Sequence, residues 1–364
     1  MKVNSDFWRG RRVLVTGHTG FMGGWLTVVL KEFGAIVTGY ALAPPTQPSF
    51  FNAVGVGELL ETDCREDVRD VTRVAGTFND CRPEIVFHLA AQPLVREAAR
   101  QPVETFDINV MGTVNVLEAA RRAEGLRSIV VVTTDKVYDN LEWDWEYREN
   151  DRLGGREPYG VSKACAEFVI DAYRASFLSA NGIGVASVRA GNIIGGGDWA
   201  AERLIPDIVR AFSSGETLIV RNPAATRPWQ HVLEPLRGCL MLAEGLFTEP
   251  ARYAGGWNFG PGREDQRPVS WIVESCARQW GDRARWRIDT NANPYEAQRL
   301  GLTCSKAELQ LGWKPFWPLS TALQQTLDWY RAMIAGRKML EYTRSQVRQV
   351  LAADSDVVLL RSAE

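Results

Sequence analysis

Tyr159 and Lys163 are the first residues whose types and spacing could do chemistry, because they stand four apart in the segment YGVSK. Pro158, a residue type favoured in the first turn of a helix, precedes them, so we expect both side chains on one helical face. Tyrosine is a poor base at neutral pH, but a cation about one helical turn away favours its phenolate form. Such a phenolate could take a proton from a sugar hydroxyl while the carbon gives a hydride to a nicotinamide. The alternative is a solvated helix face without catalytic function.

A second candidate group stands one segment earlier, at the predicted strand end formed by Thr133 and Thr134. A threonine hydroxyl there could supply the third hydrogen-bonding group beside Tyr159. Asp135 and Lys136 follow directly and add two titratable groups, which suits general acid–base catalysis. A lysine base needs a pKa lowered toward about 7 to 8, whereas an adjacent carboxylate raises it, so desolvation would have to dominate. The alternative is a surface Asp-Lys dipeptide at the end of a strand.

Three glycines, Gly17, Gly20 and Gly23, follow a predicted strand and open a predicted helix in the segment TGHTGFMGGWL. They allow a tight turn and the close approach of a pyrophosphate to the helix N-terminus, where free N–H groups favour negative charge. The spacing G-x-x-G-x-x-G differs from the common dinucleotide fingerprint, so plain strand-to-helix punctuation is the alternative. The candidate cofactor contacts are Gly17, Gly20, Phe21, Met22, Gly23, Asp67, Val68, Leu89, Ala90, Gln92, Asn109, Thr133, Tyr159 and Lys163.

The end of the second predicted strand leaves the choice between NAD and NADP open. The segment from Tyr40 to Ala43 has neither an acidic residue to hold a free ribose 2′-hydroxyl nor an arginine for a 2′-phosphate.

Short apolar runs alternate with amphipathic stretches through the first half of the chain, and these elements must position the candidate residues. The predicted strands are residues 12–16, 35–40, 84–89, 128–134 and 184–189, and the predicted helices include 21–33 and 110–123. Near-continuous apolar strands are typical of a parallel sheet that is buried on both faces. We therefore predict an α/β fold, a Rossmann-like doubly wound parallel sheet, with ligands at the carboxyl ends of the strands.

After Arg189 the pattern changes to glycine- and proline-punctuated loops between shorter helices, as in RAGNIIGGGDW and WNFGPGRED. We predict a dinucleotide-binding domain over residues 1–190, rejoined by about 229–260, a smaller α/β substrate-binding domain over 191–340 and a tail over 341–364. No Gly/Ser- or Pro-rich linker separates the units, so we expect a wide shared interface with a cleft between them.

Composition argues against several other classes of protein. The 42 Lys and Arg residues balance 44 Asp and Glu residues without a basic block, so nucleic acid is not an expected partner. No run of about 18 apolar residues occurs and the first residues lack an apolar signal core, so we expect a cytoplasmic protein without a membrane partner. The six cysteines form no C-x-x-C pair and the three histidines have no ligand spacing, so no metal site is expected.

The glycine segment, the Thr134 strand end and YGVSK together resemble the extended short-chain dehydrogenases/reductases, a family of NAD-dependent epimerases and dehydratases. Longer strings, among them TTDKVYDN, AGNIIGGGDW and RPWQHVLEPL, are similar to the members that dehydrate CDP-hexoses, over roughly residues 7 to 330. The resemblance implies NAD as cofactor and the 4,6-dehydration of a nucleotide-hexose, with CDP-glucose favoured. In that reaction oxidation at C4 acidifies the C5 proton, a base removes this proton, and an acid helps the C6 hydroxyl leave as water.

The resemblance also implies roles for individual residues. Tyr159 is the C4 base with Lys163 and Thr134 beside it, Asp135 is the acid, and Lys136 is the C5 base. Relatives that act on TDP-sugars have Asp-Glu where this chain, like the CDP-sugar enzymes, has Asp-Lys. The implied substrate contacts are Gln92, Asn192, Arg203, Leu204, Val220, Arg221 and Arg227, among which the guanidinium groups suit phosphate oxygens.

A homodimer or homotetramer is expected from the same resemblance. The predicted helix 110–123 and the helix of Tyr159 commonly pair across a two-fold axis in this family. Both stretches carry more apolar residues than one core-facing stripe needs, among them Val114, Ala119, Phe168 and Ile170.

Three residues depart from the family pattern: Met22 replaces an expected lysine, Tyr295 a histidine and Thr303 an aspartate.

Two other functions stay open. A 4-epimerase, or a 4,6-dehydratase of another nucleotide sugar, would share the glycines and the Tyr-Lys pair, although Asp135-Lys136 disfavours the epimerase. A non-catalytic NAD(P)-binding sensor would have no reason to retain that pair.

Overall fold

A computed structural model describes residues 2–289 and 297–356 of the 364-residue chain, the side chains of 352–356 excepted. Its centre is a seven-stranded sheet in the order β10-β6-β5-β4-β1-β2-β3, with every neighbouring pair parallel. The strand order runs outward in both directions from β1 and β4, which confirms the predicted doubly wound sheet. The strands are β1 (Arg12–Thr16), β2 (Ile36–Tyr40), β3 (Thr62–Cys64), β4 (Ile85–His88), β5 (Ser128–Val132), β6 (Gly184–Ala190) and β10 (Gly255–Phe259).

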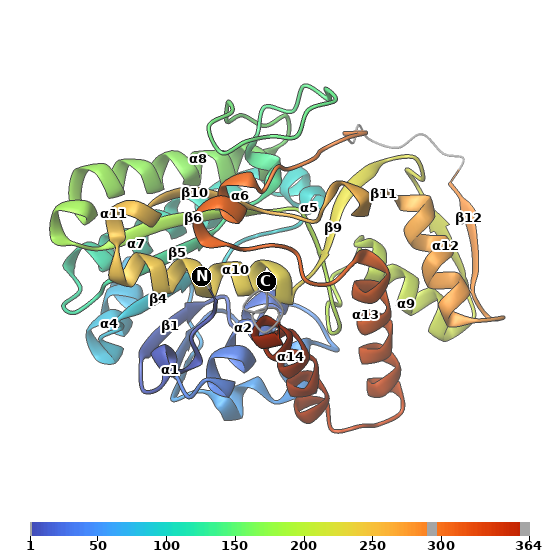
Figure 1. Cartoon of the computed structure of the whole chain (residues 1–364), viewed down its shortest axis with the longest axis horizontal. Coiled ribbons are helices and arrows are strands. Elements are labelled where there is room, and N and C mark those ends of the chain that lie inside the picture. Colours follow the sequence, from blue (N-terminus) through green and yellow to red (C-terminus); the bar gives the residue numbers. More distant parts are fainter. Residues whose placement is uncertain (1, 290–296, 357–364) are drawn as a thin grey trace, which may run out of the picture.

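Side chains of one strand alternate between two apolar cores, because successive residues of a strand point to opposite faces of the sheet. On β1, Val13 and Val15 belong to one core and Leu14 belongs to the other. Helices cover both faces (Figure 1). The first core is covered by α2 (Phe21–Glu32) and α10 (Leu233–Thr248), and the second by α4 (Val71–Cys81), α7 (Gly112–Arg122) and α8 (Pro158–Tyr173).

Most of the chain beyond residue 191 forms a smaller unit at one end of the molecule, on the right in Figure 1. It contains a three-stranded sheet in the order β11-β9-β7 and a pair of parallel strands, β12 and β8. Strand β10, by contrast, returns to the large sheet and pairs with β6. The smaller unit consists of β7 (Asn192–Ile194), β8 (Thr217–Val220), β9 (Thr226–His231), β11 (Gln266–Pro268), β12 (Arg285–Ile288), α9 (Leu204–Ser214), α12 (Val269–Trp280) and α13 (Leu319–Ile334).

Two element boundaries differ from the predicted ones next to the candidate residues. The strand predicted to end at Thr134 ends at Val132, because the Thr134 hydroxyl instead accepts a hydrogen bond from the backbone of Lys136, at 3.3 Å, and caps the short 3-10 turn η3 (Asp135–Val137). The helix predicted over residues 110–123 starts with a π-helical turn, η2 (Asp107–Met111), before α7 begins. Single π turns of this kind are frequent at functional sites.

The last helix, α14 (Met339–Asp356), packs against α2, and two of its arginines, Arg344 and Arg348, pair with Glu32. The remaining α-helices are short: α1 (Ser5–Trp8), α3 (Phe50–Val54), α5 (Val95–Arg100), α6 (Pro102–Phe106) and α11 (Pro250–Tyr253). Within residues 2–289 and 297–356, no helix combines the length and apolar character that a membrane span requires.

Candidate active site

The glycine turn between β1 and α2 leaves no room for side chains at two of its three positions. Gly17 has a φ of +77°, and a Cβ there would lie 2.7 Å from the backbone nitrogen of Ala90; a Cβ at Gly23 would lie 2.2 Å from the carbonyl oxygen of Gly17. Gly20 directly precedes α2 and provides no side-chain cap, which leaves the first amides of the helix to an outside acceptor. This turn therefore fits a pyrophosphate at a helix N-terminus.

The candidates at the neighbouring strand ends lie around the same edge of the sheet. Asp67 follows β3, where its carboxylate is held by Arg69 at 2.6 Å, an interaction that lowers the pKa of Asp67. Val68 is buried, and Tyr40 donates its hydroxyl to the carbonyl oxygen of Asp67 at 2.8 Å. Leu89 and Ala90 follow β4 directly and are partly buried.

A chain of hydrogen bonds connects Gln92 to the helix of Tyr159. The backbone nitrogen of Gln92 donates to Asn109 Oδ1 at 2.9 Å, and Asn109 Nδ2 donates to Ser162 Oγ at 2.9 Å. Ser162 in turn donates its hydroxyl to the carbonyl oxygen of Tyr159 at 2.7 Å. Asn109 lies in the π turn η2, so this turn fixes α8 against the end of β4.

Tyr159 lies in the first turn of α8 and is buried. The hydroxyl of Thr134 lies near its side chain and favours the phenolate form. Burial raises the pKa of Tyr159 to about 12, although Thr134 and the charge of Arg203 act in the opposite direction. Glu157, which the sequence analysis missed, caps this helix by accepting hydrogen bonds from the backbone of Tyr159 and of Gly160, both at 2.7 Å. The sequence signal for this cap is the position of Glu157, directly before Pro158 at the predicted start of a helix.

Lys163 is buried one turn further along α8, and burial lowers its pKa to about 8. Its ammonium donates to the carbonyl oxygen of Val132, at the end of β5, at 3.0 Å. In the described part of the chain no hydrogen bond joins Lys163 to Tyr159, although the i, i+4 spacing places the two residues on one helical face. The charge of Arg203 also acts on Tyr159 and lowers its pKa.

Asp135 carries a buried carboxylate oxygen that lacks a hydrogen-bond partner. Its Oδ1 accepts the hydroxyl of Thr134 at 3.1 Å, whereas Oδ2 has no partner among the described residues although the side chain is 2% exposed. Buried polar atoms are normally paired, so an orphaned one needs a reason, such as a reactant that completes the site. Lys136 is half-buried next to it, and its charge acts on the Glu157 carboxyl, whose pKa burial raises.

The candidate substrate contacts lie at the ends of the smaller unit's elements. Asn192 opens β7, Leu204 opens α9, and Val220 ends β8 with its side chain in the core. Arg203 precedes α9 and pairs with Asp198 at 3.0 Å while its charge acts on Tyr159, so the structure brings it to the candidate catalytic residues.

Two other arginines of this set contact backbone carbonyls. Arg227 donates to the carbonyl oxygens of Thr226 and Gln298, and Arg221 donates to that of Glu202.

Of the three departures from the family pattern, Met22 is half-buried in the first turn of α2, Thr303 is partly buried, and Tyr295 lies outside the described residues.

A doubly wound sheet whose first strand ends in a glycine turn that fits a pyrophosphate, with a buried tyrosine and lysine on α8 beside the end of β5, defines a Rossmann-fold enzyme of the dehydrogenase type. A model of the NAD dependent epimerase/dehydratase family matches residues 13–253, and the chain belongs to this family.

Relatives and solved structures agree with this assignment. The chain is 49% identical over 356 residues to a CDP-glucose 4,6-dehydratase of Salmonella typhimurium, covering 96% of this chain and 99% of that protein. It is 26% identical to a dTDP-glucose 4,6-dehydratase of Xanthomonas campestris pv. campestris, covering 87% and 92% of the two chains. The fold is similar to that of a UDP-glucose-4-epimerase from Stenotrophomonas maltophila, with a TM-score of 0.77 at 23% identity over 90% of this chain and 99% of that chain.

Proposed function

We propose that this protein catalyses the NAD-dependent 4,6-dehydration of CDP-glucose, with CDP-4-keto-6-deoxyglucose and water as products. The observation that carries the proposal is the orphaned Oδ2 of Asp135, a buried carboxylate oxygen that lies one residue from Thr134, whose hydroxyl is near Tyr159. A 4-epimerase has no need for this additional acid. The 49% identity to the Salmonella typhimurium enzyme supports CDP-glucose as the substrate.

The residues that would hold NAD are the glycine turn with Phe21 and Met22, together with Asp67, Val68, Leu89, Ala90, Gln92, Asn109, Thr133, Tyr159 and Lys163. When bound, NAD supplies the two-electron oxidation at C4, its reversal at C6 and a positive charge on the nicotinamide ring. The free amides at the start of α2 support a pyrophosphate contact at Gly20.

Tyr159 takes the proton of the C4 hydroxyl as that carbon is oxidised. In the free protein the pKa of Tyr159 is about 12, so the phenolate needs positive charge beside it. Arg203 already acts in this direction, and the ammonium of Lys163 lies on the same helical face one turn away. Thr134 lies beside the phenol and also favours its ionised form.

Asp135 and Lys136 then perform the elimination. Lys136 takes the C5 proton that the new C4 ketone has acidified, and the electrons of that C–H bond form the C5–C6 double bond as the C6–O bond breaks. Asp135 gives its proton to the departing C6 hydroxyl, which leaves as water. When C6 then takes back the hydride that came from C4, protonated Lys136 returns its proton to C5, which gives the 4-keto-6-deoxy sugar. The two side chains stand on adjacent residues of one 3-10 turn, beside Tyr159, which suits consecutive steps on one sugar ring.

The nucleoside diphosphate is assigned to the smaller unit. We assign residues 191–340 to substrate binding, with residues 1–190 and about 229–260 as the dinucleotide-binding domain and 341–364 as a tail; this division is supported by the two small sheets, whose strands all follow residue 191. Gln92, Asn192, Leu204, Val220 and the arginines at 203, 221 and 227 are the proposed contacts. Guanidinium groups suit the phosphates of this substrate.

A panel of nucleotide-hexoses tests the proposal. The purified protein is incubated with CDP-, TDP-, UDP- and GDP-glucose, with NAD or NADP added in parallel. We expect a loss of one water by mass and the ultraviolet absorbance of a 4-keto-6-deoxy sugar in base with CDP-glucose, and a larger stimulation by NAD than by NADP. A CDP-hexose product of unchanged mass would mean an epimerase, and turnover of a different nucleotide sugar would overturn the substrate assignment.

A further inference from the structure

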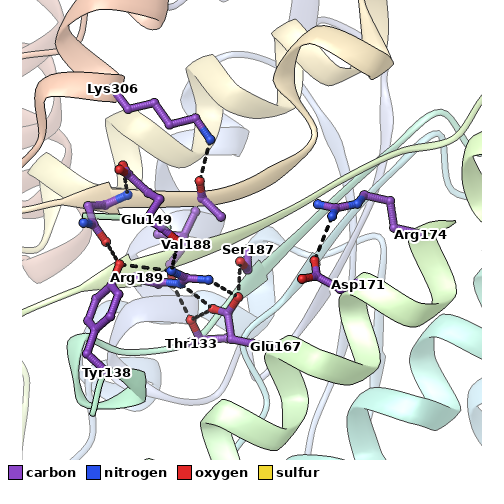
Figure 2. A network of polar contacts seen from close by, with 12 residues as sticks. Thr133, Tyr138, Glu149, Glu167, Asp171, Arg174, Ser187, Val188, Arg189 and Lys306 are labelled. Atoms are coloured by element: carbon purple, nitrogen blue, oxygen red, sulfur yellow. Dashed lines mark hydrogen bonds and ion pairs between the residues drawn. The ribbon is translucent and has the colours of Figure 1, made fainter. Parts of the chain in front are cut away.

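A buried ion pair joins Glu167 of α8 to Arg189 of β6 behind the candidate active site (Figure 2). Arg189 donates from Nη2 to Oε2 at 2.8 Å and from Nε to Oε1 at 3.0 Å, so the contact is bidentate. The hydroxyls of Thr133 and Ser187 also donate to this carboxylate, at 2.6 and 2.7 Å. The two charged side chains are only 1% and 4% exposed. The carboxylate is therefore fully hydrogen-bonded and held in one geometry.

Stability alone does not account for this pair. A buried ion pair costs so much desolvation that an apolar pair of similar volume is often as stable or more stable. The fold nevertheless makes room for Arg189, since a Cβ at Gly256 would lie 2.8 Å from its Nη2. The pair therefore calls for a role in geometry or in charge.

On one side the pair reaches the residues proposed for oxidation. Glu167 lies one helical turn beyond Lys163 on α8, and its charge favours the protonated form of that lysine, against the effect of burial. Thr133, which donates to Glu167, directly precedes Thr134, whose hydroxyl lies near the side chain of Tyr159. The Glu167 carboxylate thus connects the two segments that carry the oxidation residues: it belongs to α8, and it contacts Thr133 just beyond the end of β5.

On the other side the pair reaches the turn proposed for elimination. Arg189 Nη1 donates to the hydroxyl of Tyr138 at 3.0 Å and to the carbonyl oxygen of Glu149 at 2.9 Å. Tyr138 follows η3 immediately, and its hydroxyl donates to Asn258 Oδ1 at 2.7 Å. The same guanidinium therefore fixes the residue that closes the turn of Asp135 and Lys136 (Figure 2).

We propose that the Glu167–Arg189 pair is a positioning device that holds the oxidation residues of α8, and Thr134 beyond the end of β5, in register with the acid–base turn η3, and that it balances the charge behind Lys163. The proposal rests on the proposed function. Neither side chain lies among the residues proposed to meet substrate or cofactor, so both act through their neighbours.

The other charged or titratable groups near Lys163 and Tyr159 come from several packed elements. His88 on β4 stays neutral, because burial and the charge of Lys163 lower its pKa to about 3. The remaining groups are Glu157 before α8, Asp135 and Lys136 on η3, and Arg203 before α9. The test variants leave all of these unchanged, so their contribution cancels when variants are compared.

The charge role is tested by unfolding measurements that need no substrate. The free energy of unfolding of each variant is compared with that of the same variant carrying Lys163→Met, between pH 6 and pH 10. The pH at which this difference begins to change marks where Lys163 of the folded protein loses its proton, about pH 8 in the wild type. Glu167→Gln leaves Arg189 uncompensated, so we expect this point to move about one pH unit lower. The double variant Glu167→Gln/Arg189→Gln should return it to the wild-type value.

Asp171→Asn is the matched control, because Asp171 on α8 forms a more exposed ion pair with Arg174, the residue directly after this helix (Figure 2). It should leave the titration of Lys163 unchanged. A Glu167→Gln protein with a wild-type titration, or one in which the double variant shifts equally, would overturn the charge role.

The positioning role is tested by turnover of whichever nucleotide sugar the wild type accepts. Arg189→Lys keeps the charge but cannot donate to Glu167, Tyr138 and Glu149 together. We expect kcat to fall about tenfold, because the general acid–base groups are then mispositioned. KM should change little, and Lys163 should lose its proton at the same pH as in the wild type. Wild-type kcat in a folded Arg189→Lys protein would overturn it. The titration of Lys163 needs no substrate, so it still tests the charge role if CDP-glucose proves not to be the substrate.

Discussion

The carbonyl oxygen of Lys136 lies where a side chain at position 160 would have to stand: a Cβ on Gly160 would come within 2.7 Å of it. The Glu157 carboxylate, which caps the same helix, would lie 3.0 Å from that Cβ. The first turn of α8 therefore rests directly on the backbone of η3. The glycine between Tyr159 and Lys163 sets how closely the oxidation residues approach the acid–base turn.

Gly160→Ala should separate these two segments. The neighbour is backbone and cannot rotate away, so we expect a loss of about 1–3 kcal/mol in the free energy of unfolding, together with reduced kcat. Thermal unfolding and turnover measure both. Gly76→Ala is the control, since Gly76 lies within α4 with nothing near its Cβ, and there alanine should stabilise by up to about 1 kcal/mol. A Gly160→Ala protein as stable and active as the wild type would contradict the close contact.

Tyr159→Phe should abolish the oxidation and elimination together while nucleotide-sugar binding persists. Removing a general base costs on the order of 10²-fold or more in rate, and the phenyl ring keeps the packing. Turnover and calorimetric binding of CDP-glucose check the two expectations. Tyr173→Phe, at the far end of α8, is the control and should retain full activity. Turnover near the wild-type rate in Tyr159→Phe would remove the tyrosine from its role.

Asp135→Asn should stall the reaction after oxidation. The amide preserves the shape of the carboxylate but cannot give its proton to the departing C6 hydroxyl, so reduced nicotinamide should accumulate transiently while water is released slowly. Lys136→Ala should behave alike, because the C5 proton then lacks its base. Stopped-flow absorbance of the nicotinamide and mass analysis of the sugar separate the two stages. Full-rate formation of the 4-keto-6-deoxy product in either variant would make that side chain structural.

The sheet was predictable because its signals are local. The β-branched runs from Arg12 to Thr16 and from Ser128 onward mark strands by themselves, and the glycines that follow Thr16 mark a turn into a helix. The end of β5 was predicted two residues too late because Thr133 and Thr134 also favour a strand by composition. Only the cap that Thr134 forms on η3 shows where the strand stops.

The surroundings of the candidate residues were less predictable because they depend on tertiary packing. The spacing of Tyr159 and Lys163 indicates a common face, but it does not show that the lysine donates to Val132 or that the charge of Arg203 acts on the tyrosine. Likewise, no pattern in the sequence connects Glu167 with Arg189, which belong to different elements. Such partners come from the way helices pack on the sheet.

The buried ammonium of Lys163 should give stability and activity opposite dependences on pH. Its pKa falls from 10.5 to about 8 on folding, so between these values the unfolded chain holds a proton that the folded chain has lost, and stability rises with pH. Lys163→Met should therefore be more stable than the wild type at pH 7, by about 3 kcal/mol at most, and lose this advantage toward pH 10.5.

The activity should fall over the same interval, because deprotonated Lys163 no longer supplies positive charge near Tyr159. We expect the basic limb of kcat/KM, which reports the free enzyme, to start near pH 8. A stability difference between wild type and Lys163→Met that stays constant from pH 7 to pH 10.5 would mean that the lysine keeps its ordinary pKa.

Self-association should occur through the outer face of α8. The apolar side chains of Phe168 on α8, Met111 on η2 and Val103 on α6 are 58%, 46% and 83% exposed, and these three elements pack against one another. The sequence analysis also assigned Ala119 and Ile170 to this face, but both are buried in the chain's own core. The exposed set is still enough to form an isologous four-helix contact, which would remove the patch from water.

Phe168→Asp should therefore convert an oligomer into monomers, since an unpaired carboxylate is costly in an apolar contact. Light scattering at micromolar concentration measures the mass of both proteins. Ile334→Asp is the control, because Ile334 is 63% exposed at the end of α13, outside this surface, and it should leave the mass unchanged. A monomeric wild type would contradict self-association. An oligomer that persists in Phe168→Asp would place the contact on another surface.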